Sequence, residues 1–449
     1  MKTIVCIAVL LLCALIVGAE ESAVRGISLE DVRNMAAANS RSLAKYNMAV
    51  QSARLDEKIQ GYTNLPSLSL GLSAGTTLWS AQGEFTPSGL QDNLNAGASF
   101  SLSQRLWDGG KGRVLNAINS ISTQIARLDA LQQYFSVINA ADTAYYGMLE
   151  AAAALEAAEK SLETNVLSLS IAEIRYENRI LNISDYLQAQ AKKEEAETAR
   201  NQARRNLLVN RSKLAVLIGM DVKSLPELVP VDFSGYEELL QRCAALDDGS
   251  LDALGAGLWK TAAAQNPDYI KAGLTSRRSD ESVRLSRKDY MPSLSASLSS
   301  GLNYSISGGL EPSSGRLSLS GSIPLDFWVT AANVEKKQLA KDQAALDYRE
   351  AEMNLAIELQ TLLLDLSAGA GSVLSSRRAC EYAEKHLEYV MELYRLSQNS
   401  LSDLSDAESL VSSNRRAFIQ NQYAFLLNLS KLRSLLAMEA EDEFIGLLP

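Results

Sequence analysis

Histidine is almost missing from this chain, which has one, His386, among 449 residues. Catalysis by histidine and histidine-ligated metal sites therefore have almost no material to work with. Positive charge is also in deficit. The formal net charge of -10 argues against nucleic acid as a partner, because phosphate binding needs a basic surface. No carboxylate pair lies beside a plausible nucleophile, so the sequence predicts neither an enzyme nor a bound cofactor.

Long apolar runs are confined to the N-terminus. Lys2 precedes an apolar stretch from Ile4 to Val17, and Val17-Gly18-Ala19 is a small-residue cleavage site. We therefore predict a secretory signal peptide over residues 1–19. Cys13 raises the alternative of a lipoprotein signal, but the leucines ahead of it are not the usual small residues. No later segment approaches 18 uncharged apolar residues, so no transmembrane helix is predicted.

Cysteine is scarce as well. Removal of the signal takes Cys6 and Cys13 with it and leaves Cys243 and Cys380, on segments that we expect to lie far apart. Two free or buried thiols fit this pattern better than a disulfide.

The rest of the chain is built from two similar halves. Pro66-Ser67-Leu68 recurs as Pro292-Ser293-Leu294, an offset of 226 residues (292 − 66). Matching residues later in the chain recur at an offset of 218 residues (394 − 176). The stretch RYENRILNISD at 175–185 matches LYRLSQNSLSD at 393–403, which pairs Tyr176 with Tyr394 and Asp185 with Asp403. Several ordered matches on almost one diagonal indicate an internal repeat.

Each half follows one plan of helix, strand, loop, strand and long helical hairpin. Apolar residues from Val114 onwards step by three and four, the pattern of a helix packed as a coiled coil. The sequence predicts first helices over about 28–62 and 252–288, long helices over 110–178 and 331–396, and returning helices over 182–218 and 400–440. The second long helix carries Gly369 and Gly371, where we predict a soft interruption.

The expected division of the chain follows from this plan. Residues 20–220 form the first repeat, with strands at about 66–78 and 96–107, and residues 252–440 form the second, with strands at about 292–304 and 316–326. Residues 221–251 carry two prolines and break the helical pattern, so we expect a linker or equatorial segment there. Residues 441–449 form a C-terminal tail.

The four strands alternate between an apolar face and a face of serine and glycine. Leucine occupies every second position from Leu68 to Leu72, and Ser or Gly fills the positions between. A soluble sheet packed on helices would instead carry Lys, Glu and Thr on its outer face. All four strands reach the ~9–11 residues that a transmembrane strand needs. Aromatic residues suited to a membrane–water interface lie at the strand ends: Trp79, Trp107, Tyr290, Tyr304 and Trp328.

Four strands are too few to close a membrane barrel, because the smallest such barrels have about eight. An open edge in lipid would leave backbone groups unpaired at several kcal/mol each. Several copies must therefore pool their strands, with the leucine face toward lipid and the serine and glycine face toward a wet lumen. The alternative is a structural coiled-coil spacer or adhesin stalk of the cell envelope, which has no need of four such strands.

The signal, the duplicated plan, the Pro-Ser-Leu strand starts, LWDGG at 106–110 and the matched helix marks resemble the TolC family of outer membrane efflux proteins. The resemblance covers essentially the whole mature chain. It implies a mostly α-helical fold with a β-barrel contribution: a homotrimer shares one barrel of four transmembrane strands per chain, and long coiled-coil hairpins form a periplasmic tunnel. It also implies an outer membrane exit duct for efflux or type I secretion, in contact with lipid. Its implied partners are a periplasmic adaptor protein and a proton-driven or ATP-driven inner-membrane transporter.

The resemblance further places residues at the periplasmic aperture, near the hairpin turns. Asp403 and Asp406 match the acidic rings of the narrowest point, and Asp185 and Tyr394 match contacts that hold it shut. The adaptor-facing tips fall on Arg179, Ile180, Ser397 and Gln398. Arg179 and Ser397 stand where the family has glycines, and Asn399 stands where it has a tip arginine.

Overall fold

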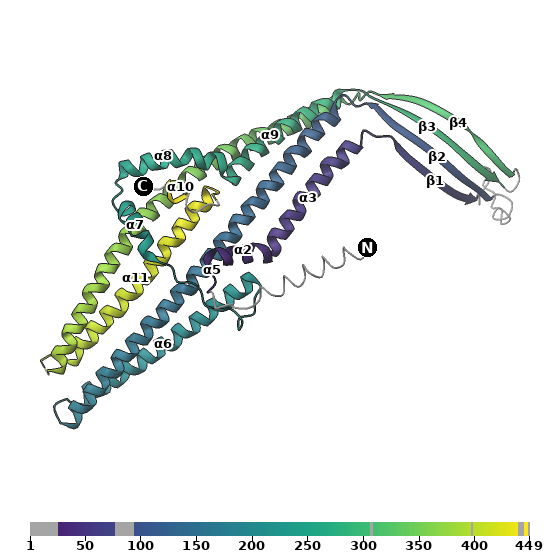
Figure 1. Ribbon diagram of the computed structural model, residues 1–449. Helices are drawn as coiled ribbons and strands as arrows, with labels where there is room; N and C mark the ends of the chain where they lie inside the picture. Colours follow the sequence, from purple (N-terminus) through teal and green to yellow (C-terminus); the bar gives the residue numbers. More distant parts are fainter. Residues whose placement is uncertain (1–25, 77–93, 306–308, 397, 439–443, 448–449) are drawn as a thin grey trace, which may run out of the picture. The chain divides into compact units, whose positions relative to one another are not determined.

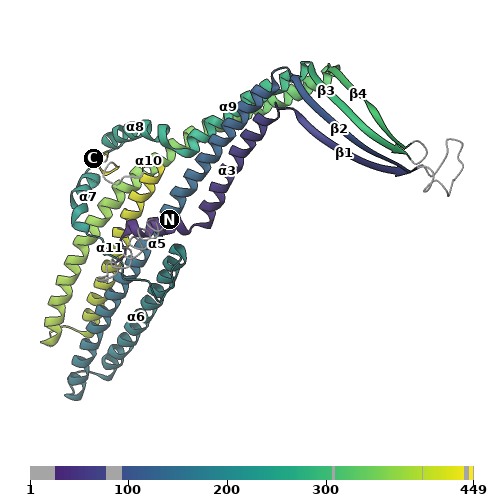
Figure 2. The same ribbon diagram turned by 45° about the vertical axis from the view of Figure 1, so that its right-hand side comes forward.

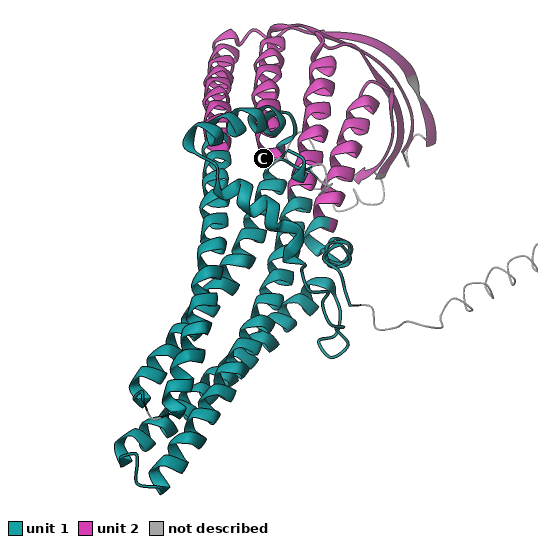
Figure 3. Ribbon diagram, turned by 60° about the vertical axis from the view of Figure 1, so that its left-hand side comes forward, with its two compact units in different colours: residues 1–43, 133–266, 356–449 teal, residues 44–132, 267–355 magenta. Residues whose placement is uncertain are grey.

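The computed structural model of the protein describes residues 26–76, 94–305, 309–396, 398–438 and 444–447 (Figure 1). The chain divides into two compact units, each assembled from separate stretches of sequence (Figure 3). Unit 1 comprises residues 1–43, 133–266 and 356–449, and unit 2 comprises residues 44–132 and 267–355. Each unit therefore draws on both halves of the duplicated sequence.

Unit 2 holds a single four-stranded antiparallel sheet. Its strands are β1 (Ser67–Thr76), β2 (Leu94–Trp107), β3 (Ser293–Ser305) and β4 (Gly309–Ser322), in the order β1-β2-β3-β4. The central β2–β3 pair joins the two repeats and places Leu102 opposite Leu298. Within the described residues, β1 and β4 each have a strand neighbour on one side only. One small sheet in a mostly helical chain agrees with the predicted fold class.

The fourth strand departs from the range predicted for it. β4 begins at Gly309 and ends at Ser322, whereas the sequence predicts a strand over 316–326. Gly309, the first residue of β4, has a φ of +76°, a left-handed conformation that favours glycine. The sequence predicts a loop up to residue 315. A shift in register between Ser299 and Gly301 allows part of this stretch to pair with β3 as a strand. The alternation of faces survives on either side of this shift.

Helices of unit 2 that lie far apart in the sequence are joined by polar side chains. The unit includes residues 44–62 of α3 (Arg41–Tyr62), α9 (Pro267–Arg287), and the first parts of α5 (Lys111–Glu177) and α10 (Phe327–Arg395). The Lys271 Nζ of α9 lies 2.6 Å from Oδ1 of Asp129 on α5. Tyr269 of α9 stacks on Tyr348 of α10, and their hydroxyl oxygens are 2.7 Å apart. α9 therefore ties both long helices together beside the sheet.

The LWDGG motif turns β2 into α5. The Asp108 carboxylate accepts hydrogen bonds from the amides of Gly110 and Gly112 at 2.9 and 2.7 Å, which caps the helix. Gly109 has a φ of +69°, in the left-handed region that favours glycine. A Cβ on Gly109 would lie 2.4 Å from Cβ of Met291. Both the backbone and this close approach therefore require glycine there.

We expect Gly109→Ala to destabilise this junction by about 1–3 kcal/mol through backbone strain, with a further loss from displacing Met291. The measurement is the midpoint of thermal unfolding of the detergent-solubilised protein. Gly257→Ala is the control, because a Cβ there meets nothing within 4 Å and alanine favours a helix. Equal unfolding midpoints for the two variants would contradict the close approach.

Unit 1 is helical and contains two long hairpins. α5 returns as α6 (Ile183–Ile218), and α10 returns as α11 (Leu401–Leu435). In Figures 1 and 2 these helices follow one another in the order α10, α11, α5, α6. α10 runs without a break through Gly369 and Gly371, contrary to the predicted interruption. A helical glycine costs only about 1 kcal/mol, and the fully buried Ala370 between them holds the helix by packing.

Both first helices are divided where the sequence predicts one continuous helix. α2 (Leu29–Asn39) and α3 are separated at Ser40, whose hydroxyl accepts a hydrogen bond from the Leu43 amide at 3.2 Å and caps α3. α8 (Asp248–Gln265) and α9 are separated at Asn266. Asn266 is extended because proline disfavours a helical conformation in the residue before it, and Pro267 then begins α9.

The segment between the repeats is part of unit 1. It contains η1 (Phe233–Tyr236) and α7 (Glu237–Ala244), and α8 already begins at Asp248. Glu237 pairs with Arg377 of α10 at 2.7 Å, and Cys243 of α7 is fully buried. Cys243 and Cys380 are both buried and free, which confirms the prediction of two unpaired thiols.

None of the helices in the described residues combines the length and the hydropathy that a membrane-spanning helix needs.

Candidate functional site

The turn of the first hairpin carries the residues predicted to face an adaptor. Arg179 has a φ of +59°, a left-handed conformation that is uncommon for any residue but glycine. Glycine adopts this backbone conformation without strain, which explains why it suits the position. Arginine adopts it here at a cost in conformational free energy. Ile180 beside it is exposed. The backbone amides of both residues donate to carbonyls of the last turn of α5, so the turn is closed by hydrogen bonds.

Asp185 lies just beyond this turn and helps to cap α6. Its amide donates to Oδ1 of Asn182 at 2.8 Å, and Nδ2 of Asn182 donates back to its carboxylate at 3.0 Å. The second hairpin repeats the arrangement 218 residues later. The amide of Asp403 donates to Oγ of Ser400 at 3.2 Å, and the amide of Ser400 donates to Oδ2 of Asp403 at 3.0 Å. Both predicted aperture carboxylates at these matched positions are therefore helix-capping groups as well.

The predicted ring residues Asp403 and Asp406 are both exposed, one helical turn apart on α11. Hydrogen bonds from the Ser400 side chain and backbone hold the pKa of Asp403 below its usual range. This carboxyl is therefore charged at neutral and mildly acidic pH. Gln398 closes the turn through its amide, which donates to the Leu393 carbonyl at 2.9 Å. Ser397 lies outside the described residues.

Tyr394, predicted to help close the aperture, is buried inside the protomer. It packs in a cluster with Ala172, Ala189 and Leu404, which come from the other three helices of the two hairpins. The Arg175 guanidinium lies 4.7 Å from the centre of the Tyr394 ring, and its Nη1 donates to the Tyr394 carbonyl at 3.4 Å. Burial raises the pKa of the Tyr394 hydroxyl. The tips of the two hairpins are thus fastened to each other through this residue.

Arg175 is a tip residue that the sequence does not single out. The only feature of the sequence that points to Arg175 is its position immediately before Tyr176, the residue that corresponds to Tyr394 in the first repeat. Tyr176 itself is partly exposed and stacks on Tyr186, with ring centres 5.0 Å apart. The two matched tyrosines therefore have different surroundings. The proposed roles of Asp185 and Tyr394 in holding the aperture shut remain predictions.

The two faces of the sheet differ in chemistry as the alternation predicts. Leucines on one face are exposed, among them Leu70, which is 70% exposed. On the other face serine hydroxyls pair across strands, with Oγ–Oγ distances of 2.6 Å for Ser69 and Ser101 and 2.8 Å for Ser297 and Ser318. Glycines fill the positions between: a Cβ on Gly71 would lie 2.7 Å from Oγ of Ser99.

The charged side chains of the described strands all belong to the serine and glycine face. Arg105 lies opposite Ser295, Glu311 opposite Asn303, and Arg316 opposite Ser299, and these partners share the register of the serine pairs. The opposite face carries Leu, Ala, Phe, Tyr, Trp, Pro, Gly, Ser and Gln, and no charge. The sheet therefore has one face fit for water and one fit for hydrocarbon.

The predicted interface aromatics fall at both ends of the sheet. Trp107 ends β2, and Tyr290 ends η2 (Lys288–Tyr290) just before β3. Trp328 is the second residue of α10, just after β4, so these three share one end. Tyr290 stacks on Phe327, with ring centres 6.2 Å apart. Tyr304 lies near the other end, on β3, and is exposed. Trp79 lies outside the described residues.

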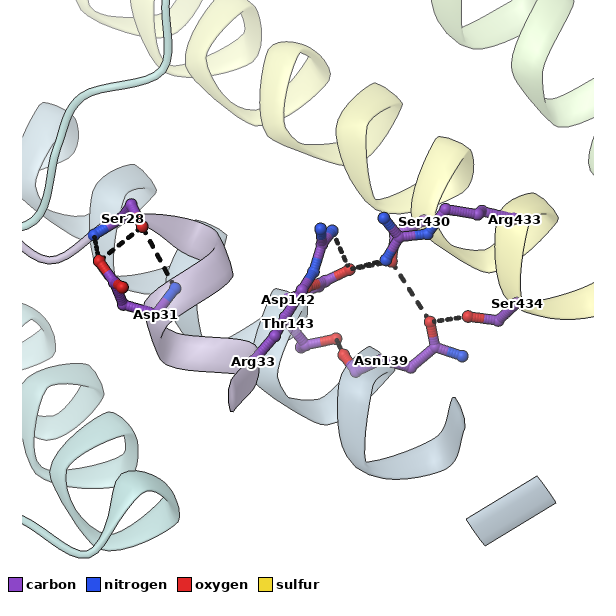
Figure 4. A network of polar contacts seen from close by, with 9 residues as sticks. All are labelled: Ser28, Asp31, Arg33, Asn139, Asp142, Thr143, Ser430, Arg433 and Ser434. Atoms are coloured by element: carbon purple, nitrogen blue, oxygen red, sulfur yellow. Dashed lines mark hydrogen bonds and ion pairs between the residues drawn. The ribbon is translucent and has the colours of Figure 1, made fainter. Parts of the chain in front are cut away.

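A buried polar network joins three helices of unit 1 (Figure 4). Arg33 of α2 donates from Nε and Nη2 to the two carboxylate oxygens of Asp142 on α5, at 2.6 and 2.8 Å. Ser430 and Arg433 of α11 approach the same carboxylate, Arg433 at 3.5 Å. Asp142 is 0% exposed. No pattern in the sequence indicates this network.

The described residues contain no group of three or more His, Cys, Asp or Glu side chains that could hold a metal ion.

Comparison with known proteins places this geometry in a family. The model of the family described as "Outer membrane efflux protein" matches residues 32–220 and 258–438, which cover most of both repeats. The outer membrane protein TolC of Escherichia coli K12 is 20% identical over 393 residues, which are 84% of this chain and 76% of that protein.

Solved structures have the same fold. CusC superposes with a TM-score of 0.76 at 16% identity, over 91% of each chain. The Campylobacter jejuni CmeC outer membrane channel superposes with a TM-score of 0.74 at 17% identity, over 94% of this chain and 90% of that one. Because the family model spans both repeats with their strands and hairpins, the protein belongs to the outer membrane efflux protein family.

Proposed function

We propose that this outer membrane efflux protein is the exit duct of a tripartite efflux or type I secretion assembly. Three copies share one barrel of four strands each, and their hairpins form a periplasmic tunnel. A periplasmic adaptor protein and an inner-membrane transporter deliver substrates, which pass through unchanged. The exposed Asp403 and Asp406 form acidic rings at the periplasmic aperture, and the hairpin turns at Arg179 and Gln398 face the adaptor.

The division of the sheet into two faces is the observation that carries this proposal. A strand face with exposed leucines and no charge suits lipid, and the opposite face with paired serine hydroxyls and all the charges suits an aqueous lumen. Each sheet leaves two strand edges without a neighbour in the described chain, and these edges must be paired in a bilayer. A coiled-coil stalk gives no reason for either feature.

The test introduces the same charge on each face at neighbouring positions of β1. Leu70→Asp places a carboxylate against hydrocarbon, so we expect much less folded protein in the outer membrane fraction; aspartate costs less than lysine or arginine, and the cost falls toward the interface. Ser69→Asp places the carboxylate in the lumen, so we expect normal insertion. Heat-modifiable migration on SDS gels measures the inserted form. Equal losses at the two positions would show that the faces are not divided between lipid and water.

A further inference from the structure

The three charged side chains of the serine and glycine face lie at three separate levels along β3. Their partners on β3 are spaced by four residues (299 − 295 and 303 − 299): Ser295 is opposite Arg105, Ser299 is opposite Arg316, and Asn303 is opposite Glu311. At about 3.3 Å per residue, successive levels are ~13 Å apart along the strand. Two neighbouring levels are therefore positive, and the third is negative.

Neither arginine is neutralised by its surroundings. Both side chains are exposed, and no carboxylate of the described residues lies within ion-pair distance of either guanidinium. Their partners on β3 are serines, whose hydroxyls are uncharged. Glu311, the one carboxylate of the described strands, lies a full level beyond Arg316. Because a guanidinium stays protonated at any ordinary pH, both positions keep their positive charge.

The proposed trimer multiplies these charges inside one barrel. Each position then occurs three times around the lumen, so Arg105 and Arg316 form two positive rings. The face behind them carries no charge that could offset the rings. Low-dielectric walls focus the field of such groups into a lumen, and rings of arginine favour anions as rings of carboxylates favour cations.

We infer that Arg105 and Arg316 are specificity-determining residues of the exit duct, which concentrate solutes with a sulfonate, phosphate or carboxylate group at their two levels of the barrel lumen. This inference rests on the proposed function and adds a charge preference to it. Glu311 reverses the preference one level beyond Arg316. The aperture is the narrowest point of the proposed duct and governs its conduction of small ions, whereas these arginines act on solutes within the barrel.

The reactivity of introduced cysteines measures the local charge, because both cysteines of the described chain are buried. Ser299→Cys places a thiol opposite Arg316, and Ser295→Cys places one opposite Arg105. The purified full-length protein in liposomes is treated with two methanethiosulfonate reagents of similar size, one with a sulfonate group and one with a trimethylammonium group. Relative to the rate ratio for a small free thiol, we expect a preference of ~fivefold or more for the anionic reagent, the effect of a unit charge about 4 Å away in water.

A site of opposite charge in the same barrel provides the matched control. Asn303→Cys lies opposite Glu311, so it should prefer the cationic reagent. In the Ser299→Cys protein, Arg316→Gln should return the rate ratio to that of the free thiol, and Arg316→Lys should preserve the preference. Salt at 1 M should reduce all of these preferences, because the screening length falls to about 3 Å.

The possible outcomes distinguish this inference from the proposed function. If Ser299→Cys reacts with both reagents in the ratio of a free thiol and Arg316→Gln changes nothing, the charge preference is wrong and the exit duct stands. If neither reagent reacts, this face of the sheet does not meet water, and both the inference and the proposed duct fail. Ser318→Cys, two residues from Arg316 on the same face of β4, gives the same readout where Ser299→Cys does not assemble.

Discussion

Replacing Asp142 with alanine is expected to lower the free energy of unfolding by about 3–5 kcal/mol. The variant would remove from the interior of unit 1 the carboxylate that both the Arg33 and the Arg433 guanidinium contact. The side chain of Arg433 is 6% exposed and that of Arg33 is 14% exposed, so water compensates little. Removal of one partner from a buried ion pair costs far more than the pair contributes net, because the remaining charge stays desolvated.

Thermal unfolding of the solubilised protein measures this effect. Glu156→Ala is the matched control, since it also removes a carboxylate of α5 from an ion pair, the one with Lys160. That pair is exposed, so its loss should cost about 0.5 kcal/mol or less. A variant with Asp142→Leu, Arg33→Met and Arg433→Met should recover much of the lost stability, because it removes all three charges together. An unfolding midpoint for Asp142→Ala equal to that of the control would show that the network does not stabilise the protein by this amount.

The network joins residues of both repeats, and the repeat-related positions do not reproduce it. The repeat mate of Asp142 is the exposed Gln360, and that of Arg433 is Ala215. The ion pairs therefore fasten the two hairpins of one chain, where α2, α5 and α11 meet. The repeat-related positions, Gln360 and Ala215, carry no charge.

Local patterns explain which parts of this fold the sequence predicts. The strands and their faces follow from alternation, which needs only neighbouring residues, and the capped hairpins follow from helix periodicity. The breaks at Ser40 and Asn266 are also local and were readable from a capping serine and from Pro267. The uninterrupted α10 is different, because the packing around Ala370 overrides the weak preference of two glycines.

Contacts between distant residues explain what the sequence does not predict. Arg33 and Asp142 are 109 residues apart, and Asp142 and Ser430 are 288 apart. Only the fold brings these side chains together, and no spacing in the sequence predicts their contact. Arg175 and Tyr394 meet in the same way across 219 residues. The capping role of Asp403, by contrast, is visible in the Ser400-to-Asp403 spacing once the start of the helix is known.

The second large effect is expected at the aperture, where Asp403→Asn with Asp406→Asn should abolish most of the cation selectivity of the pore. In the proposed trimer, three copies of each carboxylate would form two rings one helical turn apart, and converging negative charge favours cations. Asparagine suits this test because its side-chain oxygen can still accept the hydrogen bond from Ser400, so the cap of α11 persists while the charge is lost. The reversal potential across a salt gradient in planar bilayers is the measurement, and it should move close to zero.

The Asp185→Asn variant distinguishes the effect of ring charge on selectivity from the effect of aperture closure on conductance. Asp185 is the repeat mate of Asp403 and makes the same kind of capping contact, but it lies on α6, outside the proposed rings. This variant keeps the cap but removes the charge of the proposed closing contact, so it should raise conductance and leave the reversal potential unchanged. Because hydrogen bonds from Ser400 lower the pKa of Asp403, the contribution of the Asp403 ring to selectivity should persist from neutral into mildly acidic solution and decline as pH falls through that lowered value. If the doubly substituted pore keeps the wild-type reversal potential, Asp403 and Asp406 do not line the constriction, although the fold and the barrel would stand.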